Sequence, residues 1–231
     1  RYVQNLITLF ASLLLFGYFL SGSRLLALSK NEQNSCRVRG AMVVVLILCS
    51  AILVTMTLVA GVFHSSNADV CSLFLVSLPV CFFPLLTNYI NNTAQGDNHI
   101  GRLALSRLLP ALLYIPVAYF IYDNYGATPK LVALLQWGIY SIVLSLLVLS
   151  TRPSFKNLGP VLKELRSENE KYGKHLYYGF VAMVATNYIA GFTLGLFNDD
   201  NVNVGFYTLA LTLTSPLAYL PGIIGMTYFK K

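Results

Sequence analysis

Charged residues are scarce in this sequence. Lys, Arg, Asp and Glu make up only 11% of its 231 residues, whereas 56% are hydrophobic. A water-soluble domain carries about 25% charged residues, so the composition excludes an ordinary soluble protein of this length. Apolar runs of roughly 20 residues recur, which is the length that crosses a hydrocarbon core about 30 Å thick. The sequence therefore predicts an all-α polytopic membrane protein.

Motifs for catalysis and metal binding are also lacking. The sequence contains no HExxH, GxSxG or GxxxxGK[ST] motif. Its four cysteines show no CxxC spacing, and its three histidines lie far apart in the chain. We therefore expect no disulfide framework, no metal site, no cofactor and no enzymatic activity.

Seven apolar blocks are separated by short polar segments, and each block is predicted to be one membrane-spanning helix. They cover about residues 5–27, 40–63, 70–90, 103–122, 131–150, 176–197 and 204–229. The linker between the fifth and sixth blocks, residues 151–175, holds six of the sixteen Lys and Arg residues. Within it Leu158, Val161, Leu162 and Leu165 share one helical face, which predicts an amphipathic helix in the membrane interface. The alternative is a solvated loop with a turn or two of helix.

Loops between the predicted spans alternate between the two sides of the membrane, and basic residues are concentrated on one of these sides. Fourteen of the sixteen Lys and Arg residues fall on one side, and only Arg1 and Lys130 fall on the other. Because cytosolic loops are enriched in Lys and Arg, this pattern predicts an outer N-terminus and a cytosolic C-terminus. The net charge of +7 is then a topology signal, and we expect no nucleic-acid partner.

Proline pairs occur inside three of the predicted spans, where each proline removes a backbone hydrogen bond and favours a kink. A membrane tolerates the freed carbonyls only where protein or cavity water satisfies them. Bent helices around a cavity are typical of a transporter. The pairs are Pro79 and Pro84, Pro110 and Pro116, and Pro216 and Pro221.

Several polar side chains within or beside the spans are candidates for substrate binding. A polar group at membrane depth costs free energy unless it faces protein or water, so its presence there points to a functional role. The alternative for the arginines is snorkelling to lipid head groups, and for the amides it is interhelical hydrogen bonding. No Asp or Glu lies in the core of a predicted span, which disfavours an intramembrane carboxylate relay. The candidates are Arg24, Arg107, Gln136 and Asn187, with Tyr114 and Tyr140 as helical neighbours of Arg107 and Gln136.

Three stretches together resemble a transporter family. Residues 16–35 (FGYFLSGSRLLALSKNEQNS), 154–179 (SFKNLGPVLKELRSENEKYGKHLYYG) and 198–225 (NDDNVNVGFYTLALTLTSPLAYLPGIIG) are similar to segments of Wzx-like polysaccharide and O-antigen flippases. These belong to the multidrug/oligosaccharidyl-lipid/polysaccharide transporter superfamily. The most specific element is a V-G-x-Y motif, formed here by Val204, Gly205 and Tyr207.

The resemblance implies a two-lobe architecture with twelve or more helices. Residues 1–150 then form five helices of the N-lobe, 151–175 form a cytosolic linker, and 176–231 form the first two helices of the second lobe. On this reading the sequence is a fragment that lacks the first helix and the C-terminal part of the second lobe.

The function implied is that of a multi-pass flippase in the bacterial inner membrane, which moves an undecaprenyl-diphosphate-linked oligosaccharide during surface polysaccharide biosynthesis. Arg24, Arg102 and Arg107 lie on the cytosolic side and suit the anionic diphosphate, while Tyr114 and Tyr140 offer ring faces to sugars. The lipid bilayer, a polysaccharide polymerase and chain-length proteins are the other expected partners. The alternatives are a cation-coupled multidrug exporter of the same superfamily and a non-transporting scaffold in a polysaccharide-assembly complex.

Overall fold

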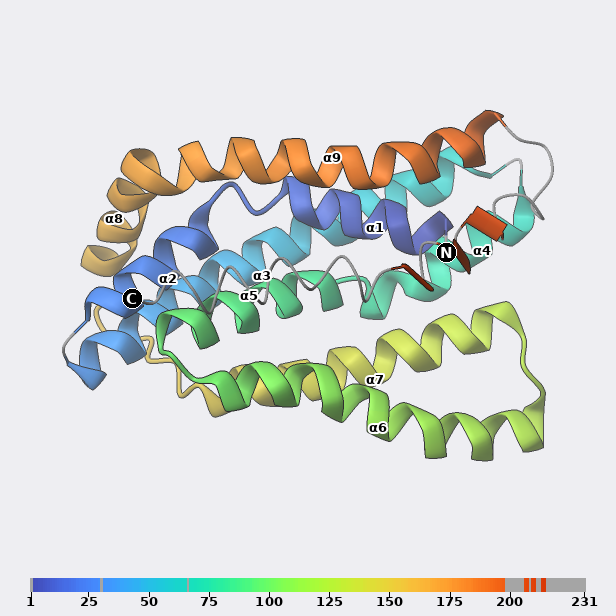
Figure 1. Ribbon diagram of the computed structural model, residues 1–231, viewed down its shortest axis with the longest axis horizontal. Coiled ribbons are helices and arrows are strands. Elements are labelled where there is room, and N and C mark those ends of the chain that lie inside the picture. Colours follow the sequence, from blue (N-terminus) through green and yellow to red (C-terminus); the bar gives the residue numbers. More distant parts are fainter. Residues whose placement is uncertain are drawn as a thin grey trace.

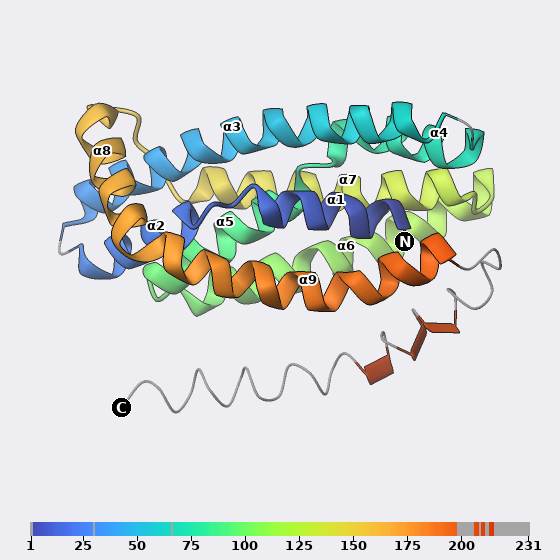
Figure 2. The ribbon, with the colours of Figure 1, turned by 90° about the horizontal axis from the view of Figure 1, so that it is seen from above.

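A computed structural model describes residues 2–29, 31–65 and 67–197, together with 206–207, 209–210 and 213–214. All regular structure in these residues is helical (Figures 1 and 2). Its elements are α1 (Tyr2–Leu13), α2 (Tyr18–Leu28), α3 (Glu32–Phe63), α4 (Ala68–Ser77), the 3₁₀ turn η1 (Leu78–Val80), α5 (Phe83–Gly96), α6 (Ile100–Tyr125), α7 (Pro129–Ser150), α8 (Leu158–Glu168), the π-helical turn η2 (Asn169–Gly173) and α9 (Lys174–Phe197).

Helices α3, α6 and α7 are each long and apolar enough to cross a membrane. The pair α1 and α2, and the pair formed by α4–η1 and α5, meet the same test only when each bent pair is counted as one span. The described residues therefore contain three candidate spans, or up to five, and support a membrane protein. The sixth predicted block coincides with α9. The seventh lies largely outside the described residues, so seven spans stay a prediction.

The first predicted span is not one continuous helix. It breaks between α1 and α2, whose axes differ by 58°. Gly17 begins the second half with φ of 79°, a left-handed conformation that glycine adopts without steric cost. A Cβ atom at this position would also overlap the carbonyl of Gly173. No proline lies near this break. The prediction of one continuous helix over the first apolar block was wrong.

The third predicted span breaks where its prolines predicted. The α4–η1 segment and α5 differ by 40° at a break that lies between Pro79 and Pro84. By contrast, α6 continues through Pro110 and Pro116 as a single helix. Pro216 and Pro221 lie outside the described residues.

Most helices run along the long axis of one bundle (Figures 1 and 2). Helix α9 lies beside α1, and the α6–α7 hairpin packs against α5. One end of the bundle, which we term the basic end, gathers the end of α2, the start of α3, the end of α5, the start of α6, the end of α7, and α8 (Figure 1). The predicted alternation of loops likewise brings these ends together. Which side of a membrane they occupy stays a prediction.

Large apolar side chains lie both inside the bundle and on its outer faces. Phe19, Met42 and Tyr89 belong to the buried core. Ile47 on α3 and Leu112 on α6 are at least 60% exposed, as are many of their apolar neighbours. Such outer faces suit hydrocarbon surroundings better than water.

The charged linker contains the predicted amphipathic helix, α8. Val161 and Leu165 are buried, and Leu158 and Leu162 pack against the core, so the predicted apolar face is confirmed. This face contacts the protein, because α8 packs on α2 and α3. The predicted position of α8 in the membrane interface stays a prediction. The domain boundaries at 150 and 175 stay predictions.

Candidate functional site at the basic end

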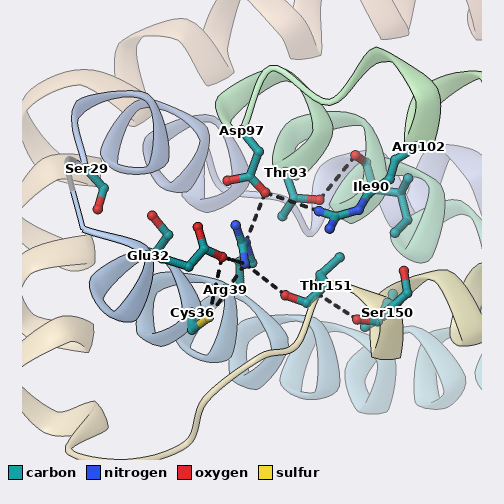
Figure 3. Close-up of polar contacts among 12 residues, drawn as sticks. Ser29, Glu32, Cys36, Arg39, Ile90, Thr93, Asp97, Arg102, Ser150 and Thr151 are labelled. Carbon is teal, nitrogen blue, oxygen red and sulfur yellow. Dashed lines mark hydrogen bonds and ion pairs between the residues drawn. The ribbon is translucent and has the colours of Figure 1, made fainter.

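Arg39, in the second turn of α3, is the most deeply buried cation among the described residues of this end. Its side chain is only 4% exposed. Nε lies 3.0 Å from Oδ2 of Asp97, and Nη1 lies 3.0 Å from Oε1 of Glu32 (Figure 3). Nη1 also donates a hydrogen bond of 3.0 Å to the carbonyl oxygen of Thr151. The guanidinium therefore joins three segments that are distant in the sequence.

Asp97 forms ion pairs with two arginines. It follows the last residue of α5, is 5% exposed, and lies 3.4 Å from Nη1 of Arg102 as well as beside Arg39. A buried charge is tolerated when it is paired and hydrogen-bonded, and here two cations meet two carboxylates. The cluster of Glu32, Arg39, Asp97 and Arg102 is thus formally neutral (Figure 3).

Tyr89 and Thr151 extend this cluster into the core. The Tyr89 hydroxyl lies 3.3 Å from the carbonyl oxygen of Arg39 and 3.2 Å from Oγ1 of Thr151. The backbone N–H of Ser154 donates to the carbonyl of Cys36 at 2.8 Å. These bonds connect the start of α3, the middle of α5 and the end of α7. The cluster therefore holds the ends of these helices together through ion pairs and hydrogen bonds.

A second contact, which we term the linker joint, connects the broken first span to η2. The backbones of Gly17 and Gly173 approach so closely that neither position has room for a Cβ atom. The Ser21 hydroxyl donates to Oδ1 of Asn169 at 3.3 Å. One turn further along α2, Nη1 of Arg24 lies 2.8 Å from Oε1 of Glu168.

The predicted substrate-binding residues occupy several separate places. Arg102 belongs to the buried cluster and Arg24 to the linker joint, where its guanidinium also lies 4.5 Å from the ring centre of Tyr172. Arg107 is exposed. On the remaining spans, the Tyr114 hydroxyl lies 3.0 Å from that of Tyr122, Gln136 is half-buried, and the ring of Tyr140 packs edge-on against Phe83. The side chain of Asn187, in α9, lies outside the described residues.

Sequence reasoning missed the residues at the centre of the buried cluster. Arg39 entered the prediction only as one of the basic loop residues. No role was predicted for Asp97, Glu32, Tyr89 or Thr151. A usable signal existed, because Arg39 directly precedes the second apolar block and Asp97 follows the third. Opposite charges bounding two apolar blocks on the same side of a membrane are candidates for an ion pair.

Comparisons with known proteins add no relatives: no protein-family model, curated protein or solved structure matches this chain. Among the described residues, no group of three or more His, Cys, Asp or Glu side chains is arranged to hold a metal ion. The interpretation of the site therefore depends on its own geometry.

Proposed function

We propose that this chain is part of a flippase that moves an undecaprenyl-diphosphate-linked oligosaccharide across the bacterial cytoplasmic membrane. The observation that carries the proposal is a pair of broken membrane helices packed together. Helices α1 and α2 form one, α4–η1 and α5 form the other, and α5 contacts both halves of the first. In transporters, discontinuous helices of this kind surround the substrate site. A simple membrane anchor has no use for them.

Two carbonyl groups at the first break accept hydrogen bonds from neighbouring helices. The Tyr177 hydroxyl of α9 donates to the carbonyl of Leu13, and Sγ of Cys49 on α3 lies 3.2 Å from the carbonyl oxygen of Leu14. Irregular backbone at membrane depth requires such partners. The packing of the bundle therefore stabilises the break, and this supports a role beyond membrane anchoring.

The basic end supplies the chemistry for a lipid diphosphate. Arginine binds phosphate through paired N–H donors, and the substrate is expected to be made on the cytosolic side, where the basic end is predicted to lie. Arg24 is 46% exposed at its side chain and Arg102 is 23% exposed, so both remain accessible beside their carboxylate partners. A diphosphate entering here would compete with Glu168 and Asp97 for these guanidiniums.

Gene deletion tests this proposal. The host gene would be deleted and then restored as the intact wild type, the double variant Arg24→Ala/Arg102→Ala, or the control Arg166→Ala, whose side chain is 75% exposed. We expect deletion to abolish surface polysaccharide, and only the wild type and the control to restore it at equal protein level. Unchanged polysaccharide on deletion, with altered drug accumulation, would instead indicate an exporter. Full rescue by the double variant would favour a scaffold.

A further inference from the structure

A small pocket lies where the broken first span meets α5 and α9. Its volume is about 40 Å³. The first turn of α2, the preceding break, one face of α5 and the start of α9 form its walls. The lining residues are Leu15, Gly17, Phe19, Leu20, Asn88, Asn92, Tyr177 and Phe180. We term it the asparagine cavity.

Two amide side chains stand out in this otherwise apolar and aromatic lining. Asn88 and Asn92 are four residues apart on α5, and therefore on one face of the helix. Each uses Nδ2 to donate to the carbonyl one turn earlier, at 3.0 Å to Pro84 and 2.8 Å to Asn88. Within the described part of the chain, no hydrogen bond reaches Oδ1 of either residue. Both therefore retain an acceptor for an incoming donor.

The cost of placing these amides here argues for a use. Asn92 is only 9% exposed, so water has little access to its amide. An amide acceptor without a hydrogen-bond partner is unfavourable at such a position. An apolar pocket with a few convergent polar groups is the usual form of a ligand site.

The walls of the asparagine cavity include Phe19 and two aromatic residues of α9, Tyr177 and Phe180. Tyr177 is also bonded through its hydroxyl to Leu13 and contacts the ring of Phe16, so α9 closes over the break. Amide oxygens accept hydrogen bonds from hydroxyl groups, and aromatic rings pack against the C–H faces of sugars. The combination suits a ligand that is rich in hydroxyl groups.

We propose that Asn88 and Asn92 bind hydroxyl groups of the oligosaccharide head group. This inference rests on the proposed function and assigns the sugar-recognising part of that transporter. The present volume admits only a group about the size of one or a few water molecules. For a sugar ring to enter, α9 must move away from the break, which releases the hydrogen bond between Tyr177 and the carbonyl of Leu13.

Binding measurements on the purified full-length protein test the inference. The probes are the lipid-linked oligosaccharide fraction extracted from host membranes and a polyprenyl diphosphate that carries no sugar. The variants are Asn88→Leu/Asn92→Leu, which removes both amides at similar volume, and Asn88→Leu alone in case the double variant fails to fold. Asn124→Leu is the matched control, because exposed Asn124 makes the same bond to the carbonyl one turn earlier.

We expect the double variant to bind the sugar-bearing lipid about tenfold more weakly, and Asn88→Leu several-fold more weakly, because hydrogen bonds to sugar hydroxyls are lost. Binding of the sugar-free lipid should stay unchanged in every variant. Equal affinities of wild type and variants for the sugar-bearing lipid, or equal losses for both lipids, would overturn the inference. This readout is independent of transport. Sugar-dependent binding together with unchanged polysaccharide on gene deletion would contradict the flippase and leave the binding site standing.

Discussion

Arg39 and Asp97 form a buried ion pair that ties the start of α3 to the end of α5. Nε and Oδ2 are 3.0 Å apart, and both side chains are about 95% buried at the basic end (Figure 3). Neither charged group can be hydrated by bulk water unless the bundle opens locally. The pair therefore holds two ends of predicted spans, one of which is broken, in a fixed position at the basic end.

Removing one member of this pair should be more damaging than removing both. Arg39→Ala leaves Asp97 with only Arg102 at 3.4 Å, and Asp97→Ala leaves the buried guanidinium with the exposed carboxylate of Glu32 and the carbonyl of Thr151. We expect each to lower the free energy of unfolding by about 3–5 kcal/mol, the usual cost of breaking a buried ion pair. Thermal unfolding of the full-length protein in detergent measures this. Arg39→Met/Asp97→Leu should lose less than either single variant, and additive losses would contradict the buried-pair account.

Glu32→Ala is the control for that series. Glu32 also pairs with Arg39, but its side chain is 78% exposed. Exposed ion pairs contribute about 0–1 kcal/mol, so its loss should barely shift the unfolding midpoint. A loss as large as that of Asp97→Ala would show that exposure does not separate the two carboxylates.

The close contact in the linker joint predicts that alanine substitutions at different glycines have different effects on stability. Gly17→Ala combines a side chain at φ of 79° with an overlap against Gly173, and Gly173→Ala overlaps the Gly17 carbonyl and the Ser21 hydroxyl. Each should destabilise the protein by about 1–3 kcal/mol. Gly179→Ala, with no atom within 4 Å of its added Cβ, should be neutral or slightly stabilising. The same thermal measurement applies, and equal shifts at all three positions would rule out the close backbone contact.

Arg24 separates a structural role from a substrate role. Its pair with Glu168 is partly exposed, so either Arg24→Ala or Glu168→Gln should alter stability by less than about 1 kcal/mol. If Arg24 binds the diphosphate, Arg24→Ala reduces surface polysaccharide at normal protein level while Glu168→Gln does not. Arg24→Lys should rescue only in part, because lysine lacks the paired donors. Equal polysaccharide in Arg24→Ala and Glu168→Gln cells would assign Arg24 to the joint alone.

Membrane orientation is open to a direct labelling test. In a background without the four native cysteines, cysteine replaces either Tyr125, at the end of α6, or Lys156, in the linker; both positions are exposed. A membrane-impermeant maleimide added to intact spheroplasts should label Tyr125→Cys and leave Lys156→Cys unlabelled until the cells are opened. The reverse pattern would contradict a cytosolic basic end.

Local sequence patterns predicted those features of the fold that depend on neighbouring residues in the chain. Long apolar runs located α6 and α7, Pro79 and Pro84 located the second break, and the spacing of leucines located the buried face of α8. The break at Gly17 was missed because it carries no proline signal, and the contact between Gly17 and Gly173 is tertiary.

The candidate site was less predictable than the fold. The count of Lys and Arg in alternate loops predicted that basic residues gather on one side, but such a count treats every loop arginine alike. It does not show that Arg39 is buried against Asp97 while Arg107 is exposed. Likewise, Asn88 and Asn92 looked like ordinary residues at the end of an apolar block. Only packing against the first break and α9 gave them a cavity.

Reconstituted transport is the most direct test of the central claim. The purified full-length protein would be placed in liposomes with a fluorescent lipid-linked oligosaccharide, and the fraction accessible to a membrane-impermeant quencher would be followed over time. The account predicts that wild-type protein accelerates movement of the labelled lipid between leaflets, and that Arg24→Ala/Arg102→Ala protein does so much more slowly. Liposomes with active, correctly folded wild-type protein that flip no faster than protein-free liposomes would contradict it.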